Sequence, residues 1–196
     1  MSKIIVIAGT PGTGKSTIGG LLAEICGLKV LNLSTIALER GFVAYYDEAR
    51  QTYVIDEERL AGYIAELAEK YGDITVLTHY PEILPKHLVK AVFVLRTHPL
   101  ELEKRLLARG WSRKKINENV MAEILGVVAH NAVETFGEDK VFELDTTSMS
   151  PEECAKLLCR AIRGEGVLSP GVSIDWLSRL SLSDISRFKD YEGGGD

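Results

Sequence analysis

The 196-residue sequence contains only three cysteines, Cys26, Cys154 and Cys159, and no Cys-x-x-Cys pair. Zinc sites are typically built from such pairs, so the sequence argues against a structural zinc ion. Few, scattered cysteines also favour a reducing compartment. With 45% hydrophobic residues, the chain can form a sizeable core, and we expect it to be stable without disulfide bonds or metal.

Long hydrophobic runs are also absent. The first apolar run, Ile4–Ala8, is followed at once by glycine, which makes it too short for a signal-peptide core or a membrane span. The net charge of −5 argues against nucleic-acid binding by bulk electrostatics. We therefore expect a soluble cytoplasmic protein with no membrane partner, with the nucleus as the alternative if the source is eukaryotic.

Apolar runs alternate with helical patterns along the chain. Five runs with little polar alternation predict buried strands, at Lys3–Ala8, Lys29–Leu33, Asp73–His79, Ala91–Arg96 and Val141–Asp145. Helical spacing and end signals predict helices at Lys15–Cys26, from a Ser34 cap to Glu39, from Asp56, at Pro99–Ala108, from about Lys114 to Phe136, and from Ser150 to Gly164. The tyrosine-rich segment Phe42–Ile55 is predicted to be mostly loop. Strands separated by helices indicate an α/β fold with a parallel sheet sandwiched by helices.

A glycine-rich turn, GTPGTGKST at Gly9–Thr17, follows the first strand and opens the first helix. We call this segment the phosphate loop. It matches the GxxxxGK[ST] pattern, whose glycines let backbone amides surround a polyphosphate. The residues predicted to bind ATP phosphates are Gly12, Thr13, Gly14, Lys15, Ser16 and Thr17. Among them, Lys15 supplies a positive charge for the β and γ phosphates, and the Ser16 hydroxyl supplies a ligand for Mg²⁺. The GxGxxG spacing of dinucleotide-binding proteins is absent.

Three arginines are candidates for further phosphate contacts. Arg96 ends the fourth predicted strand, where it either reaches the ligand crevice or caps the sheet edge. Arg105 and Arg109 lie four residues apart on one helical face, so they either clamp phosphates or are solvated. The segment 109–113 is a candidate for a short lid. The acidic strings Tyr46-Asp47-Glu48 and Asp56-Glu57-Glu58 are interpreted as solvated surface rather than metal ligands.

Longer strings give a more specific signal than the phosphate loop. The chain resembles the adenylate kinase isoenzyme 6 family of archaeal and eukaryotic ribosome-assembly ATPases, from Lys3 to about Arg163. Besides the phosphate loop, the resemblance rests on YDE at Tyr46–Glu48, IDEERL at Ile55–Leu60, VFVLRT at Val92–Thr97, RLLARGWSRKKINEN at Arg105–Asn119 and PEE at Pro151–Glu153.

The resemblance implies a five-stranded P-loop domain over residues 1–163, with a nucleotide-monophosphate arm at about 32–56 and a lid at about 108–118. It implies an adenylate kinase that uses ATP, Mg²⁺ and AMP, with Arg109 touching ATP, and a slow ATPase activity. It also implies a small-subunit ribosomal platform protein as partner and a role in small-subunit RNA maturation, with pre-ribosomal RNA met only indirectly.

The chain departs from the family at one position. Family members often carry Asp-x-His at the end of the third strand, whereas this chain has Leu77-Thr78-His79. Mg²⁺ would then be held by Ser16, phosphates and water, and weak hydrolysis is expected. His79 is interpreted either as a hydrogen-bonded structural residue or as a catalytic one that positions the attacking water or a partner.

Two functions remain open from the sequence. One is a broad-specificity adenylate or nucleoside monophosphate kinase, and the other is an ATP-gated assembly switch with little kinase activity. The Asn-Lys-x-Asp string of guanine-binding switches is absent, which argues against a GTPase. Residues 164–196, which we call the C-terminal tail, lie outside the resemblance. The tail carries a linker and apolar side chains, among them Trp176 and Phe188, that need to be covered by this domain, a second copy of it or a different protein. We expect them to dock on the domain.

Overall fold

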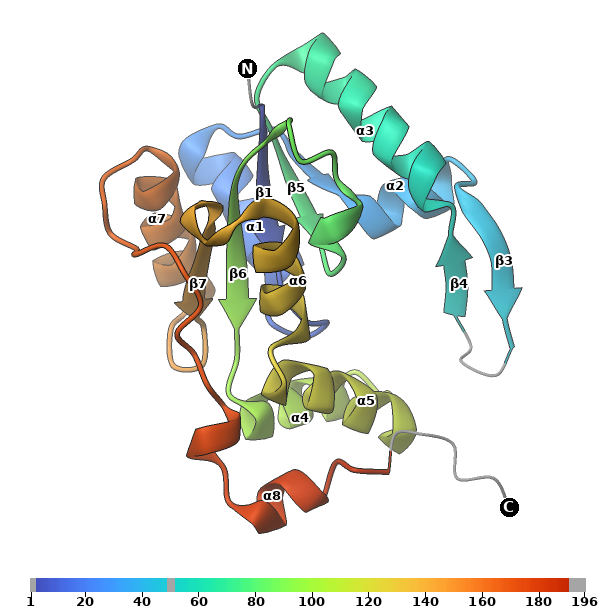
Figure 1. The fold of residues 1–196 in the computed structure, drawn as a ribbon, viewed down its shortest axis with the longest axis vertical. Coiled ribbons are helices and arrows are strands. Elements are labelled where there is room, and N and C mark those ends of the chain that lie inside the picture. The colour runs from blue at the N-terminus through green and yellow to red at the C-terminus, as the bar shows by residue number, and fades with distance from the viewer. Residues whose placement is uncertain (1–2, 49–51, 191–196) are drawn as a thin grey trace.

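A parallel five-stranded sheet forms the centre of the protein in a computed structural model that describes residues 3–48 and 52–190 (Figure 1). The strand order is β2-β5-β1-β6-β7, with bounds β1 Ile4–Ala8, β2 Val30–Asn32, β5 Ile74–Thr78, β6 Val89–Arg96 and β7 Val141–Asp145. Helices cover both faces, so the predicted α/β class is confirmed. The central strand β1 lies between β5 and β6, and the phosphate loop therefore leaves the middle of the sheet.

Two helices cover one face of the sheet and three cover the other. Helices α1 (Lys15–Cys26) and α7 (Pro151–Ile162) pack on the face that carries Ile5 and Ile7. The opposite face is covered by α2 (Leu33–Glu39), α3 (Glu57–Tyr71) and α6 (Val127–Phe136). Every residue of β1 and β5 is buried, which explains why these strands show no polar alternation.

Helix starts follow the predicted capping chemistry in two cases and differ in one. The Asp56 side chain accepts a hydrogen bond from the Arg59 amide at the start of α3. Ser150 and Glu153 form a reciprocal capping box at the start of α7. The prediction that Ser34 caps α2 is wrong, because Asn32 holds that place and accepts from the Thr35 amide at 3.2 Å.

The segment predicted to be mostly loop is instead a β-hairpin. Strands β3 (Val43–Asp47) and β4 (Thr52–Ile55) pair antiparallel, and residues 49–51 between them lie outside the described part of the chain. Tyr46 lies opposite Tyr53, with ring centroids 5.0 Å apart. Such cross-strand aromatic pairs stabilise a two-stranded sheet, and the many tyrosines that we read as loop composition are better explained as strand residues.

The single long helix predicted over residues 114–136 is two helices. Helix α5 (Arg113–Ile124) ends before Gly126, and α6 starts after it. Gly126 adopts the left-handed conformation, with φ 65°. That conformation favours glycine and cannot continue a right-handed helix, so the chain changes direction between α5 and α6.

Two of the scattered cysteines are joined by a disulfide that the sequence did not lead us to expect. Cys26 ends α1 and Cys159 lies in α7, and the structure links them by a disulfide, with Cα atoms 6.1 Å apart. They are 133 residues apart in sequence and meet because α1 and α7 pack side by side on one face (Figure 1). Cys154 is a buried free cysteine, and burial raises the pKa of its thiol.

The described part of the C-terminal tail packs on the domain, as predicted. It runs past β7 to the 3-10 helix η3 (Leu177–Arg179) and to α8 (Leu182–Ser186), beside α4 (Pro99–Ala108) and α5 (Figure 1). Trp176 is 2% exposed and Phe188 fully buried, the latter against Leu102, Leu106 and Ile116. In the described ranges, 3–48 and 52–190, no helix has both the length and the apolar character needed to cross a membrane.

Candidate functional site: the phosphate loop and its supports

The phosphate loop connects β1 to α1 through glycines that no other residue could replace without strain. Gly9 has φ 147°, and a Cβ there would lie 2.6 Å from the Leu95 carbonyl oxygen. Gly12 has φ 99°, and a Cβ there would lie 2.6 Å from Leu102 of α4. The loop is thus packed against β6 on one side and α4 on the other. A glycine-rich loop that leads into the N-terminus of a helix can bind an anion through its backbone amides.

Hydroxyl groups from neighbouring strands brace the loop. Thr13 Oγ1 donates to the Thr10 carbonyl at 2.9 Å, which closes the loop on itself. Thr146, just after β7, donates to the Thr13 carbonyl at 3.3 Å. Thr97, just after β6, contacts Thr146 through the two hydroxyl oxygens at 2.8 Å. The residues that follow β6 and β7 therefore hold the phosphate loop in place.

Lys15 places its ammonium group across the loop. Its Nζ donates to the Gly9 carbonyl at 2.5 Å and to the Thr10 carbonyl at 3.1 Å. Desolvation by burial lowers the pKa of Lys15 to about 7; Glu123 opposes that shift and Arg109 adds to it. A desolvated ammonium group whose partners in the described ranges are carbonyl oxygens fits an anion such as a polyphosphate.

Glu123 on α5 is a part of the site that the sequence analysis missed. Its Oε2 accepts from Thr10 Oγ1 at 2.6 Å, and its Oε1 accepts from Arg96 Nε at 2.8 Å and from the Thr97 amide at 3.1 Å. The signal was present in the sequence: Glu123 lies at helical spacing on the buried stripe of α5 with Ile116, Val120 and Ile124. An acid on an apolar helical stripe indicates a paired buried carboxylate.

Arg96 does not reach the ligand crevice, nor does it cap an exposed edge. It is 1% exposed and paired with both Glu123 and Glu143. Burial alone would lower its pKa, but the two carboxylates raise it above the usual arginine value. Arg96 is therefore a structural cation that ties β6, α5 and β7 together.

Arg105 and Arg109 differ in their surroundings. Arg105 donates to Glu101 at 3.3 Å and to the Thr146 carbonyl at 3.4 Å, so it is occupied within the fold. Arg109 follows α4 as its exposed C-cap, and its charge contributes to the lowered pKa of Lys15. Arg109 is thus near the phosphate loop. Its contact with ATP and the lid boundaries remain predictions.

His79 lies beside the site at the carboxyl end of β5. Burial lowers the pKa of its imidazole to about 4, and the positive charge of Lys15 adds to this shift. The imidazole is therefore neutral at physiological pH, as a hydrogen-bond partner or proton acceptor must be. Its ring centroid lies 4.0 Å from that of Tyr80.

Leu77 takes the place of the family acid and turns away from solvent. It is 4% exposed, and a Cβ on Gly19 of α1 would lie 2.6 Å from it, so the helix packs directly on this side chain. The exposed Ser16 hydroxyl is 3.5 Å from Asn32 Nδ2. Ser16 fits as one hard oxygen ligand for Mg²⁺. Among the described residues, no group of three or more His, Cys, Asp or Glu side chains could hold a metal ion.

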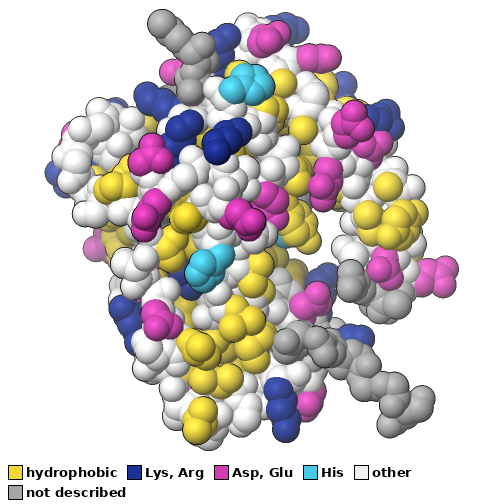
Figure 2. Space-filling model, viewed as in Figure 1, with side chains coloured by type: hydrophobic (Ala, Val, Ile, Leu, Met, Phe, Trp, Pro, Cys, Tyr) yellow, Lys and Arg dark blue, Asp and Glu magenta, His cyan; other side chains and the backbone are white. Residues whose placement is uncertain are grey.

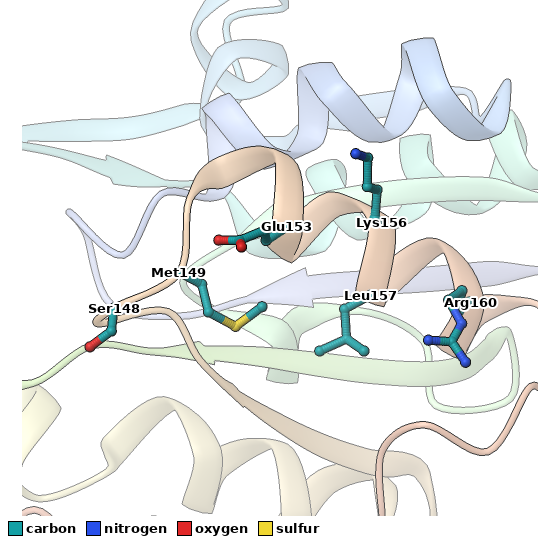
Figure 3. Close-up of a pocket in the computed structure, with 6 residues that line it drawn as sticks. All are labelled: Ser148, Met149, Glu153, Lys156, Leu157 and Arg160. Atoms are coloured by element: carbon teal, nitrogen blue, oxygen red, sulfur yellow. The ribbon is translucent and has the colours of Figure 1, made fainter.

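Two other surfaces lie apart from the phosphate loop. A pocket of about 400 Å³ on the outer side of α7 is lined from that helix and the turn before it (Figure 3); its residues are Ser148, Met149, Glu153, Lys156, Leu157 and Arg160. Figure 2 shows a hydrophobic patch over the β3–β4 hairpin, where Tyr45, Tyr46 and Tyr53 are exposed. An opening separates the hairpin from the body of the protein (Figure 2).

A family model and two solved structures match this chain. Residues 5–126 match the model of a family described as an AAA domain. Two shikimate kinases share the fold. That of Acinetobacter baumannii, in complex with shikimate, has a TM-score of 0.59 at 15% identity and covers 85% of this chain and 96% of its own. That of Bacteroides thetaiotaomicron has a TM-score of 0.55 at 15% identity, covering 82% and 98%.

Sequence relatives are more similar. A "Putative adenylate kinase" of Sulfurisphaera tokodaii is 40% identical over 183 residues, covering 93% of this chain and 90% of the relative. One of Pyrococcus furiosus is 35% identical over 88% of this chain and 91% of its own. An "Adenylate kinase isoenzyme 6 homolog" of Caenorhabditis elegans is 36% identical, covering 79% and 86%. The chain, with its intact phosphate loop, therefore belongs to the adenylate kinase isoenzyme 6 family.

Proposed function

We propose that this protein transfers the γ-phosphate of ATP to the phosphate of AMP and releases two ADP. The observation that carries the proposal is Lys15, a desolvated ammonium group that, among the described residues, donates hydrogen bonds only to loop carbonyls. A polyphosphate in the phosphate loop would supply the missing anion. The relatives carry the names "Putative adenylate kinase" and "Adenylate kinase isoenzyme 6 homolog", and these names point to AMP as the acceptor.

The chain's own groups account for most of the proposed chemistry. Lys15 and the loop amides stabilise the charge that develops on the phosphates, and Arg109 adds a second cation from the end of α4. Gly12, Thr13, Gly14 and Thr17 surround the phosphates. Ser16 would hold Mg²⁺, which when bound neutralises phosphate oxygens. An oxygen of the AMP phosphate attacks the γ-phosphorus of ATP. The bond between the γ-phosphorus and the oxygen that bridges it to the β-phosphate breaks, and ADP leaves.

The opening beside the β3–β4 hairpin gives the acceptor a place to enter (Figure 2). The hairpin lies within the predicted monophosphate arm, about residues 32–56, and the exposed tyrosines at its surface offer rings on which a base can stack. Neutral His79, beside Lys15, is placed to accept a hydrogen bond from the acceptor or from water.

Finer aspects of the function rest on the family resemblance alone. They are a slow ATPase activity, a small-subunit ribosomal platform protein as partner and a role in small ribosomal subunit maturation. A cytoplasmic location is proposed separately, from the few scattered cysteines and the short apolar runs of the sequence. The buried Leu77 in place of the family acid supports weak hydrolysis, because no carboxylate stands there to orient water or metal. An ATP-gated assembly switch is the alternative that these features would serve.

A steady-state assay of ADP formation separates the two functions. The protein is given Mg²⁺ and ATP alone, then ATP with AMP, and then ATP with shikimate as a matched acceptor control. We expect ADP formation to depend on AMP and to stay at the background rate with shikimate. A rate unchanged by AMP would contradict the kinase and favour the switch. Lys15→Met serves as the control for contaminating kinases.

A further inference from the structure

A single buried carboxylate joins the phosphate loop to the C-terminal tail. Thr10 in the loop donates to Glu123 Oε2 at 2.6 Å, and Trp176 in the tail donates from its indole Nε1 to Glu123 Oε1 at 3.1 Å. Glu123 is 1% exposed and Trp176 is 2% exposed, so water does not compete for these bonds. Two residues from distant parts of the sequence thus share one acceptor group.

The tail also forms hydrogen bonds with the other two members of the buried charged cluster, which consists of Arg96, Glu123 and Glu143. The backbone amides of Ser173 and Ile174 donate to Glu143 Oε2 at 2.6 and 2.8 Å. Arg96 donates to the Ile174 carbonyl at 3.2 Å. Without the tail, Glu143 would lose both of these donors and Glu123 would lose the indole. The cluster behind the phosphate loop is therefore fully satisfied only when the tail is docked.

A second anchor fixes the tail on α4 and α5. Phe188 is fully buried between these helices, and Arg187 donates to Glu103 Oε2 at 2.9 Å. Glu103 also accepts from Arg113, at the start of α5, at 2.6 Å. The segment predicted to be the lid and the helix that carries Glu123 are thus both in contact with the tail, because Ile116 packs with Phe188 and Asn117 donates to the Asp190 carbonyl.

The bonds to Glu123 have a consequence for Lys15. Glu123 is near enough to Lys15 to influence it electrostatically, yet they form no ion pair among the described residues. Its Oε1 is held by Arg96, the Thr97 amide and Trp176, and its Oε2 by Thr10. These donors keep the carboxylate from turning onto the ammonium group. A Glu123–Lys15 ion pair would compete with phosphate for the same cation.

We propose that Glu123 is a positioning residue that shapes the phosphate loop and keeps Lys15 available for ATP, and that the C-terminal tail sets its geometry through Trp176. A partner that lifted the tail would thereby weaken ATP binding. The inference deepens the proposed function and rests on it only for the identity of ATP as the ligand.

The test is Trp176→Phe, which keeps an aromatic ring but removes the N–H donor. We expect the dissociation constant for ATP, measured by titration calorimetry without AMP, to rise by about fivefold or more. Phe136→Leu is the matched control, because Phe136 is also buried but lies in α6 on another core cluster. We expect the control to lower the melting temperature and to leave ATP affinity unchanged.

A double-mutant cycle tests whether Glu123 carries the effect. Thr10→Val removes the loop donor at nearly constant volume, and Thr10→Ser restores a hydroxyl. If both donors act through Glu123, the losses of ATP affinity from Thr10→Val and Trp176→Phe combine non-additively, and Thr10→Ser retains most of the affinity. Additive losses would place the two residues in separate roles and overturn the proposal.

Hydrogen exchange of the unmodified protein provides a measurement that no folding defect can obscure. Because coupling is reciprocal, ATP should slow amide exchange at Ser173 and Ile174. Two results would show that the tail is purely structural and overturn the proposal. One is unchanged amide exchange at Ser173 and Ile174 when ATP binds. The other is an unchanged ATP affinity in Trp176→Phe together with a fall in melting temperature like that of Phe136→Leu. Both measurements omit AMP, so a protein that binds ATP but phosphorylates no AMP would refute the kinase and leave this inference standing.

Discussion

Lys15 and Arg96 are two cations placed near the carboxyl ends of neighbouring strands, and they differ in what surrounds them. Arg96 is 1% exposed and contacts two carboxylates, and these raise its pKa. Lys15 contacts two neutral carbonyls, and desolvation lowers its pKa to about 7. Within the described part of the chain, the fold has thus paired one cation internally and left the other without a contacting anion.

This difference separates a structural cation from a ligand-binding one. A buried charge that is neutralised within the protein contributes to the fold and has nothing left to offer a ligand. A desolvated charge without a partner costs stability and persists where a ligand supplies the partner. From the residues alone, Arg96 and Arg109 were both open candidates for a phosphate contact, and the family resemblance favoured Arg109. The side-chain partners of Arg96 exclude it, whereas the contact of Arg109 with ATP stays a prediction.

The largest expected effect comes from removing the unpaired cation. Lys15→Met should lower turnover by about a thousandfold or more, because the charge that stabilises the transferred phosphate is lost. The melting temperature should not fall, since a desolvated ammonium group is replaced by an apolar side chain of similar length. Steady-state ADP formation and thermal unfolding check the two parts. Normal turnover in the folded variant would show that the site is misplaced.

Arg96→Met should affect stability instead. It leaves the buried carboxylates of Glu123 and Glu143 without their counterion, and we expect a loss of about 3–5 kcal/mol in the free energy of unfolding. Denaturant unfolding measures this loss, with Lys15→Met as the matched control. A loss under about 1 kcal/mol would erase the contrast between the two cations.

Arg109→Ala should have a smaller effect, confined to activity. Arg109 is exposed at the end of α4, so its removal should leave the melting temperature unchanged. If it contacts ATP from a lid, turnover should fall by about tenfold. Lys104→Ala provides the matched control, because Lys104 is an exposed cation on the same helix. Equal turnover for both variants would assign Arg109 to the solvated surface.

The smallest effect is an uptake of at most one proton. With a pKa of about 7 in the free protein, Lys15 is largely neutral at about pH 8. Bound phosphates favour the ammonium form, so ATP binding should take up a proton at about pH 8 and little at about pH 6. Calorimetry in buffers of different ionisation enthalpy measures this uptake. The same uptake in Lys15→Met would assign the proton to another group.

Local signals were enough for much of the fold. The phosphate loop and the helix starts at Asp56 and Ser150 were predicted because each depends on residues a few positions apart. The hairpin at β3 and β4 was missed because its strands are short and its exposed tyrosines do not alternate with apolar residues. The break at Gly126 was missed because the helical pattern of apolar residues continues on both sides of it.

The sequence by itself determined where a polyphosphate could bind, since positive-φ glycines, a lysine and a helix start are all local requirements. Only the tertiary structure decided which charges are free to act there. Glu123 and Glu143 reach Arg96 from α5 and β7, Glu123 also reaches Thr10 of the phosphate loop, and Trp176 reaches Glu123 from the C-terminal tail. Whether a buried charge is paired depends on distances between groups far apart in the chain, and those distances are set when the helices and the tail pack on the sheet.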